Sequence, residues 1–222
     1  AAYDLAAGRP VPPGPKWSAH FGPFQLKSAM FLERLGALTG VPEYRERAER
    51  LLERTLAAQD PSGRFPTVPD GAATHLHPHF YAVEGLLCLH ARLGRPRALA
   101  AGRRAIRWAL EACLLPSPPC QQWGRTPDLR IAGLRSDVVA QALRAHALAG
   151  PGDPPLPDPA PLEMVLDSFR LPGGGTAYGE DEHGRKAGHA NAWCHFFALE
   201  ARLLRASAAR GGTAESEAAH IT

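Results

Sequence analysis

The apolar residues of this chain fall into two kinds of helical pattern that alternate along the sequence. In residues 24–39 they recur at the three- to four-residue spacing of one helix face. Residues 43–58 are dense in Glu and Arg around a narrow apolar stripe, which indicates an outer helix facing water. Residues 78–93 are apolar nearly all round, and residues 191–206 are also rich in apolar groups, as expected for buried helices. The pattern predicts an all-α fold.

Proline and glycine mark the boundaries of these segments. Gly40 and Pro42 end the first helix in the expected order. Ser136 is expected to cap a helix over 137–148. Further helices are expected at 97–115 and 160–170. We therefore predict three parts: an extended arm over residues 1–23, a helical domain over 24–206 and a disordered, polar tail over 207–222.

The buried helices can be superposed as repeats. Equivalent polar positions fall at Glu33, Glu84, Gln141 and Glu200, separated by 51, 57 and 59 residues. This spacing suits two helices and two connections per repeat. A helix that is apolar on all sides needs neighbours on all sides, and a ring of inner helices wrapped by outer helices supplies them. A ring is favoured, while a straight solenoid satisfies the same pattern.

Two segments carry a resemblance to a known superfamily. One is the turn Gln59-Asp60-Pro61-Ser62-Gly63-Arg64-Phe65, and the other is the histidine-bearing stretch from His75 to Leu87. Together with the helical repeat they resemble the six-hairpin (α/α) toroid enzymes, which include glycoside hydrolases and N-acylglucosamine 2-epimerase-like proteins. The resemblance covers about residues 24–206 and implies a partial or complete α/α toroid. The four inner and three outer helices expected here fall short of the six pairs of a full toroid, so the chain is predicted to be an open ring or part of a longer protein.

Composition narrows the possible functions. The 222 residues are 45% hydrophobic and 21% charged, with a net charge of +3 and interspersed signs, so nothing indicates nucleic-acid binding. No apolar run is long enough to cross a membrane and no signal peptide is visible, so a cytoplasmic protein is expected. The four cysteines form no CxxC pair and are predicted to be buried free thiols.

Three histidines at alternating positions precede the buried helix at 78–93. Histidine suits acid–base chemistry because its pKa lies near neutrality. In α/α toroids, the N-terminal ends of the inner helices line the cavity, so we expect His79 to act in proton transfer there. Four neighbours are expected to bind substrate: His75, His77, Tyr81 and Glu84. The alternative is that one or two of these histidines cap the helix or bind backbone.

A second cluster lies at the start of the last helix. His195 is a candidate catalytic residue, and His189, Asn191 and Trp193 are candidate substrate contacts. The indole face of Trp193 can stack on a sugar ring, although tryptophan is as often a core residue. Asn191 can equally serve as an N-cap.

Charged residues near other inner-helix ends complete the predicted site. Asp137 is a candidate catalytic acid or base, or a carboxylate that the helix dipole stabilises. Arg135 and Lys27 are candidates for binding an anionic group of the substrate. The acidic run at 180–182 is more typical of a solvated surface. Histidine and cysteine occur in numbers that a zinc site needs, but no complete ligand motif is present, so neither a metal nor a cofactor is expected.

These features favour a carbohydrate-active enzyme that hydrolyses or epimerises a sugar or oligosaccharide in a central cavity. One alternative is a non-catalytic helical-repeat protein that binds a partner on its concave face. The other is a prenyl- or terpene-type enzyme, although neither DxDD nor DDxxD occurs in the chain. The sequence leaves the substrate and the oligomeric state open.

Overall fold

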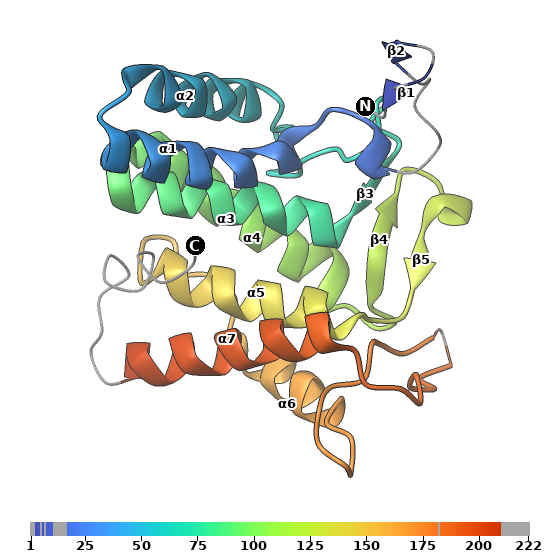
Figure 1. Cartoon of the computed structure of the whole chain (residues 1–222). Coiled ribbons are helices and arrows are strands. Elements are labelled where there is room, and N and C mark those ends of the chain that lie inside the picture. Colours follow the sequence, from blue (N-terminus) through green and yellow to red (C-terminus); the bar gives the residue numbers. More distant parts are fainter. Residues whose placement is uncertain (1–2, 5, 7, 11–16, 182, 210–222) are drawn as a thin grey trace.

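The computed structural model describes residues 3–4, 6, 8–10, 17–181 and 183–209. Figure 1 shows the elements of this part of the chain, which is largely helical. Its α-helices are α1 (Lys27–Thr39), α2 (Pro42–Ala57), α3 (Leu76–Leu93), α4 (Pro96–Ala109), α5 (Ser136–Ala149), α6 (Ala160–Ser168) and α7 (Ala192–Ala209). Its strands are β1 (Tyr3–Asp4), β2 (Arg9–Pro10), β3 (Ala73–His75), β4 (Cys120–Gly124) and β5 (Ile131–Ala132).

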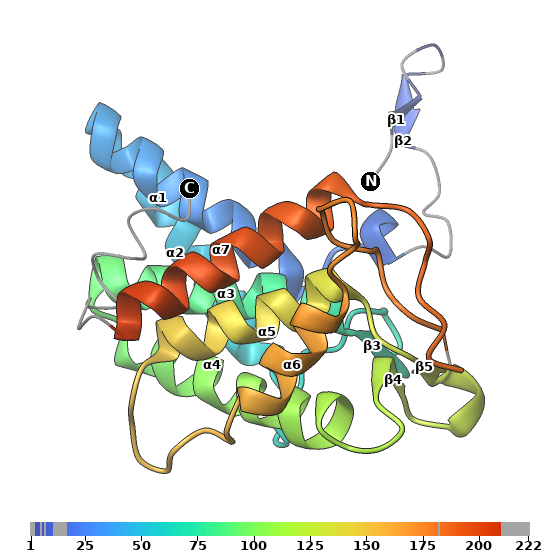
Figure 2. The same cartoon turned by 90° about the horizontal axis from the view of Figure 1, so that it is seen from below.

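The helices form two layers. Helices α1, α3, α5 and α7 lie in one row, in which α1 packs on α3, α3 on α5 and α5 on α7. We call these four helices the inner row. Helices α2, α4 and α6 pack against α1, α3 and α5, and Figure 2 shows α4 and α6 on one side of the row. The prediction of an all-α protein made of helical hairpins is thus confirmed, and the chain forms an arc of an α/α toroid.

The hairpin turns follow from a few residues. Gly40 ends α1 at a φ of 70° and Gly94 ends α3 at a φ of 59°, a left-handed conformation that glycine adopts without strain. Pro42 and Pro96 then begin the outer helices α2 and α4, where a missing N–H costs nothing. The same Gly-then-Pro order thus ends an inner helix and begins an outer helix at both hairpins, and at Gly40 and Pro42 it confirms the predicted boundary.

The turn at residues 59–65 joins the first hairpin to the second. The Gln59 amide donates to the carbonyl oxygens of Gly63 and Ala101, both at 2.9 Å, and accepts from Arg104. Gly63 has a φ of 100°, and a Cβ there would come within 2.5 Å of the Arg104 carbonyl oxygen. Only glycine fits this contact, so the turn that carries the family resemblance is a tight joint between the hairpins.

Helix α3 is the centre of the core. Thirteen of its residues are buried, as its nearly continuous apolar sequence predicts. Gly85 lets it approach the 3₁₀ helix η2 (Pro23–Leu26) closely, since a Cβ at Gly85 would lie 2.7 Å from Leu26 Cγ. The first inner helix therefore begins with a 3₁₀ turn pressed against α3.

A small antiparallel sheet, which the sequence analysis did not predict, lies beside the N-terminal ends of the inner row. Strand β4 pairs with β3 on one side and β5 on the other. These strands have two to five residues, too few for a clear alternating pattern. Their pairing depends on contacts between segments some 50 residues apart in the chain.

Several predicted boundaries are corrected. Helix α3 begins at Leu76 rather than near Pro78, with His75 as its N-cap residue. Ser136 does not cap α5, because its hydroxyl donates to the Ala177 carbonyl oxygen and Arg135 takes the cap position. Helix α7 continues to Ala209, so residues 207–209 are its last turn. In the predicted arm, β1 and β2 pair and residues 17–19 form a 3₁₀ turn. Residues 1–2, 5, 7 and 11–16 of the arm, and 210–222 of the tail, lie outside the described residues.

The cysteine prediction is confirmed, because Cys88, Cys113, Cys120 and Cys194 are all buried free thiols. Within the described ranges, no helix combines the length and the apolar character needed to span a membrane.

Candidate functional site

The N-terminal ends of α3 and α5 bring a histidine, an arginine and an aspartate together. Asp137 is fully buried, and its Oδ2 lies 3.0 Å from His77 Nδ1. The Arg135 guanidinium donates to both oxygens of the same carboxylate, from Nε to Oδ1 at 3.0 Å and from Nη2 to Oδ2 at 2.5 Å. The backbone N–H of Val138 donates to Oδ1 at 3.0 Å. A carboxylate with this many charged and polar partners is rigidly held.

These partners also set the charge of Asp137. Burial by itself would raise the pKa of this carboxyl group, but the bond to His77 and the positive charge of Arg135 outweigh burial and hold the pKa below its usual range. Asp137 is therefore an ionised carboxylate at neutral pH, although water does not reach its side chain.

Tyr81 lies one helical turn beyond His77. Its hydroxyl oxygen is 2.8 Å from His77 Nε2, so Asp137, His77 and Tyr81 form a continuous polar chain. Burial, together with the charges of Glu84 and Asp137, raises the pKa of Tyr81 to about 12. Tyr81 thus keeps its proton at neutral pH. The ammonium group of Lys27 lies 4.1 Å from the centre of the Tyr81 ring, a cation–π contact.

An ion-pair chain crosses all four helices of the inner row. Lys27 of α1 contacts Glu84 of α3 at 2.7 Å, and Glu84 contacts Arg144 of α5 at 3.1 Å. Arg144 in turn lies 3.0 Å from Glu200 of α7. The middle pair is buried, whereas the outer members keep exposed fractions of 35% for Lys27 and 50% for Glu200. Each inner-row helix contributes one charged side chain, so these ion pairs link all four helices.

Gln141 lies one turn after Asp137 on α5 and is fully buried. Within the described residues, neither its amide nitrogen nor its amide oxygen has a hydrogen-bond partner. A buried polar group without a partner is costly and calls for an explanation. Asp137, Gln141 and Arg144 are spaced for one face of the helix, so this amide belongs to the same polar strip.

Aromatic side chains surround these groups. The ring centre of His77 lies 6.1 Å from that of Phe197 and 6.3 Å from that of Trp17. Trp193 packs edge-on against Phe197 and remains 55% exposed. We use the name polar cluster for the following residues: Lys27, His77, Tyr81, Glu84, Arg135, Asp137, Gln141, Arg144 and Glu200.

His79, the first of the predicted catalytic residues, lies outside the polar cluster. It is fully buried, with Nδ1 accepting from the Phe65 N–H at 3.3 Å and Nε2 3.2 Å from the Ala105 carbonyl oxygen. Burial lowers the pKa of His79 to about 4, so the ring is neutral and links the loop at Phe65 to α4. These contacts match the backbone-binding alternative of the sequence analysis.

The other predicted residues lie at or just before the N-terminal ends of α3 and α7. His75 is half-buried at the N-cap of α3, where burial and the charge of Arg135 lower its pKa. Asn191 caps α7 through its side-chain oxygen, which accepts from the Cys194 N–H at 3.1 Å. His195 Nδ1 lies 3.3 Å from the Thr176 hydroxyl, and His189 is exposed. Direct contacts bring together Lys27, His77, Tyr81, Glu84, Arg135 and Asp137. Among the described residues, the hydrogen bonds of His79 and His195 go to groups outside the polar cluster.

Arg144 of the polar cluster was not singled out from the sequence, nor were Phe197 and Trp17, whose rings lie beside the cluster. Arg144 offered a signal, because an arginine inside an otherwise apolar helix needs a buried acid. Trp17 lies in a stretch without periodicity and offered none.

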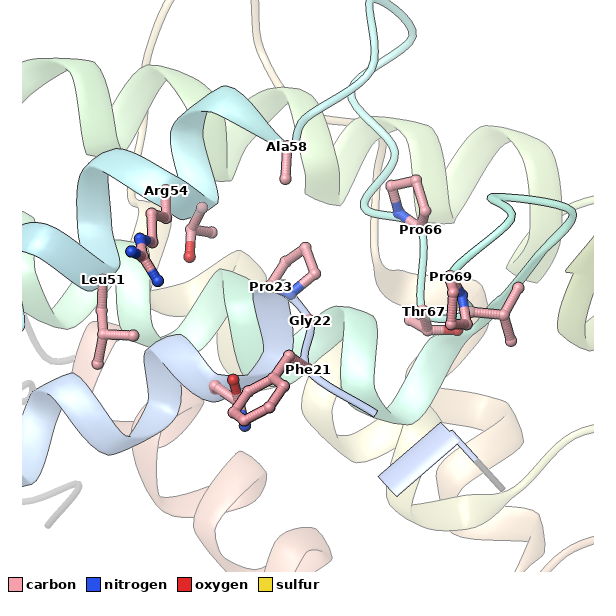
Figure 3. A pocket seen from close by; sticks show the side chains of 12 residues that line it. Phe21, Gly22, Pro23, Leu51, Arg54, Ala58, Pro66, Thr67 and Pro69 are labelled. Carbon is pink, nitrogen blue, oxygen red and sulfur yellow. The ribbon is translucent and has the colours of Figure 1, made fainter. Parts of the chain in front are cut away.

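A separate hollow of about 370 Å³ lies between η2, α2 and the loop at Pro66–Pro69. Figure 3 shows Phe21, Pro23, Leu51, Arg54 and Pro69 around it. None of its lining residues belongs to the polar cluster. Among the described residues, no group of three or more His, Cys, Asp or Glu side chains is arranged to hold a metal ion.

The arrangement defines the chain as an α/α toroid arc whose charged polar cluster extends from the N-terminal ends of α3 and α5 to the middle of the inner row. No protein-family model and no curated protein matches the sequence. Solved structures share the fold, among them the following three. Unsaturated glucuronyl hydrolase from Bacillus sp. GL1, which is responsible for the degradation of glycosaminoglycan, is 16% identical with a TM-score of 0.64. A UGL variant with the sugar dGlcA-Glc-Rha-Glc is 15% identical with a TM-score of 0.64. A family 105 glycoside hydrolase from C. acetobutylicum ATCC 824 is 13% identical with a TM-score of 0.65.

The match covers 92% of this chain but only 63% or 64% of each of the three neighbours. The chain therefore spans less than two thirds of their length. The expected toroid fold is confirmed by these structures, which are glycoside hydrolases.

Proposed function

We propose that this protein is a carbohydrate-active hydrolase that acts on an acidic sugar at the polar cluster. The observation that carries the proposal is the chain Asp137–His77–Tyr81, which joins an ionised carboxylate to a protonated phenol through an imidazole. A glycosidic bond is cleaved by a proton donor and a group that activates or replaces water. The cluster offers both roles within one set of contacts.

The roles follow from the environment of each group. Asp137 is held as an anion by Arg135 and His77, so it is suited to accept a proton or to stabilise positive charge. Tyr81 retains its proton at neutral pH, so its hydroxyl is present as a proton donor. His77, which lies between them, can accept a proton from one of them and donate a proton to the other. In this proposal the catalytic histidine is His77, in place of His79 and His195.

The preference for an acidic sugar rests on which charges reach the solvent. Asp137 and Glu84 are fully buried, while Lys27 is 35% exposed and Arg135 is 25% exposed. Glu200, which is 50% exposed, is paired with Arg144, two turns beyond Asp137 on α5. A substrate that approaches Asp137 therefore meets the cations Lys27 and Arg135 first, and a sugar carboxylate would complement them. The neighbour named as a glucuronyl hydrolase, and the neighbour with dGlcA in its sugar, support this substrate class.

The test is to incubate the purified chain with oligosaccharides that end in a uronic acid or in a neutral sugar, and to follow products by mass spectrometry. We expect cleavage, with addition of water, of the acidic set. Epimerisation, which the sequence left open, would leave the mass unchanged. Asp137→Asn and Tyr81→Phe, both close in shape to the parent, should lower turnover at least about 100-fold.

His189→Ala is the matched control, because His189 is exposed and lies outside the cluster. Circular dichroism on each variant separates loss of activity from loss of fold. If the acidic glycans are neither bound nor cleaved, or if both cluster variants turn over like the parent, the proposed function is wrong. Binding without turnover would favour the non-catalytic helical-repeat protein.

A further inference from the structure

Large apolar side chains are exposed along the two end helices of the inner row. On α7 the exposed fractions are 55% for Trp193, 63% for Phe196, 40% for Leu199 and 68% for Leu203. On α1, Phe31 is 65% exposed and Leu38 is 70% exposed. Their spacing of three, four or seven residues places each set along one side of its helix. Contiguous apolar surface of this kind usually marks an interface.

These apolar side chains are exposed because α1 and α7 lie at the two ends of the inner row. Helices α3 and α5 each have an inner-row neighbour on both sides, and their apolar side chains are buried. Helix α1 has α3 on one side only, and α7 has α5 on one side only. The exposed stripes therefore mark the sides on which a further inner helix would pack.

We propose that a second copy of this chain covers both stripes, with α7 of each copy packed against α1 of the other. A twofold axis parallel to the inner helices makes both contacts at once, because each copy offers one α1 edge and one α7 edge. It also keeps the inner helices parallel, as they are within the arc (Figure 1), so that the contact between copies continues the packing of α5 against α7. The ring would then close with two arcs.

The charges on the two edges and the area that they would bury both support a second copy as the partner. Arg34, on the α1 edge, is exposed and has no ion-pair partner within the described ranges, while Glu200 on α7 is half-exposed. If each of the six apolar side chains buries roughly 100 Å², the two contacts together cover on the order of 1,200 Å², the lower end for a stable dimer. The closed ring would also place the polar clusters of both copies around one enclosed space, although the dimer does not depend on the proposed function.

The first experiment measures the mass of the full chain by light scattering and sedimentation at tens of micromolar. We expect a dimer for the parent and a monomer for the double variant Phe196→Glu and Leu203→Glu. Met164→Glu is the matched control, since Met164 is 70% exposed on the outer helix α6, and it should remain dimeric. Circular dichroism confirms that each variant is folded.

The second experiment identifies the edges that meet. Phe31→Lys and Phe196→Glu should each prevent the dimer alone, because each damages both contacts of a symmetric pair. Mixing the two variants should restore a dimer, since one contact is then unaltered and the other pairs a lysine with a glutamate. A monomeric parent, a dimer that survives Phe196→Glu with Leu203→Glu, or a mixture that stays monomeric would each overturn the proposal.

Discussion

Glu84 of α3 and Arg144 of α5 form an ion pair in the middle of the inner row, with Arg144 Nη1 3.1 Å from Glu84 Oε1. Their side chains are 0% and 2% exposed. Removing two charges from water is expensive, and the cost is recovered only when each charge keeps its partner. The two outer members of the chain, Lys27 and Glu200, each add a second partner from a different helix.

This arrangement predicts a large loss of stability for Glu84→Gln. The change leaves Arg144 and Lys27 without their shared carboxylate, and breaking a buried pair typically costs 3–5 kcal/mol. We expect about 3 kcal/mol, measured by urea denaturation, because Glu200 still contacts Arg144. The control is Glu46→Gln, which breaks an exposed pair with Arg50 and should cost less than about 1 kcal/mol. Equal effects for the two variants would contradict this view of the ion-pair chain.

The unpartnered amide of Gln141 predicts that its replacement increases the stability of the protein, the opposite of the effect of Glu84→Gln. Gln141→Leu replaces a buried polar group by an apolar group of similar size, and we expect stability to rise by about 1 kcal/mol. Gln122→Leu is the comparison, because the Gln122 amide donates to the Leu129 carbonyl oxygen at 2.6 Å and its loss should destabilise the protein. Thermal or urea unfolding measures both variants. A loss with Gln141→Leu as large as that with Gln122→Leu would show that the amide stabilises the fold.

His79 predicts a specific dependence of stability on pH. Its pKa is lowered to about 4 in the folded state, mainly by burial, from 6.5. Between these values the unfolded chain binds a proton that the folded chain does not, so stability falls as pH drops from about 6.5 to 4, by up to about 3 kcal/mol. His75 and His146, whose pKa values are also lowered, act in the same direction.

The measurement is the free energy of unfolding at several pH values for the parent, His79→Gln and the exposed-site variant His189→Gln. Only His79→Gln should flatten the slope in this window, whatever its effect on stability at neutral pH. A parallel curve for His79→Gln would mean that the buried ring is not neutral in the folded protein.

Arg135 predicts a change in the protonation of Asp137. Removing the guanidinium in Arg135→Gln withdraws a nearby positive charge and its hydrogen bonds, so the pKa of Asp137 should rise. Carbon-13 NMR titration of the aspartate carboxyl groups measures this rise directly. If the chain hydrolyses acidic glycans, the acid side of its pH–activity profile should move to higher pH as well. Arg125→Gln, at an exposed arginine outside the cluster, should leave both unchanged.

The sequence by itself determined the helices and their pairing, because those depend on local chemistry. Apolar spacing located six of the α-helices to within three residues, whereas the predicted segment 97–115 is α4 followed by a π-helix at Leu110–Leu114. The Gly-then-Pro signal at Gly40 and Pro42 located the first hairpin turn. The repeat alignment also singled out Glu84 and Glu200, which lie in the ion-pair chain. The strands were missed because they are short and pair with distant segments.

Only the tertiary structure decided which polar side chains meet. His77 and His79 are two residues apart on one helix, which places their side chains on different faces: His77 contacts Asp137, and His79 contacts the backbone of Phe65 and Ala105. The packing of α3 against α4 and α5 decides which of the two histidine side chains reaches Asp137. Residues far away in the chain set that packing. Local spacing can bring histidines to the end of a helix, but only the packing of whole helices selects the one that reaches an aspartate.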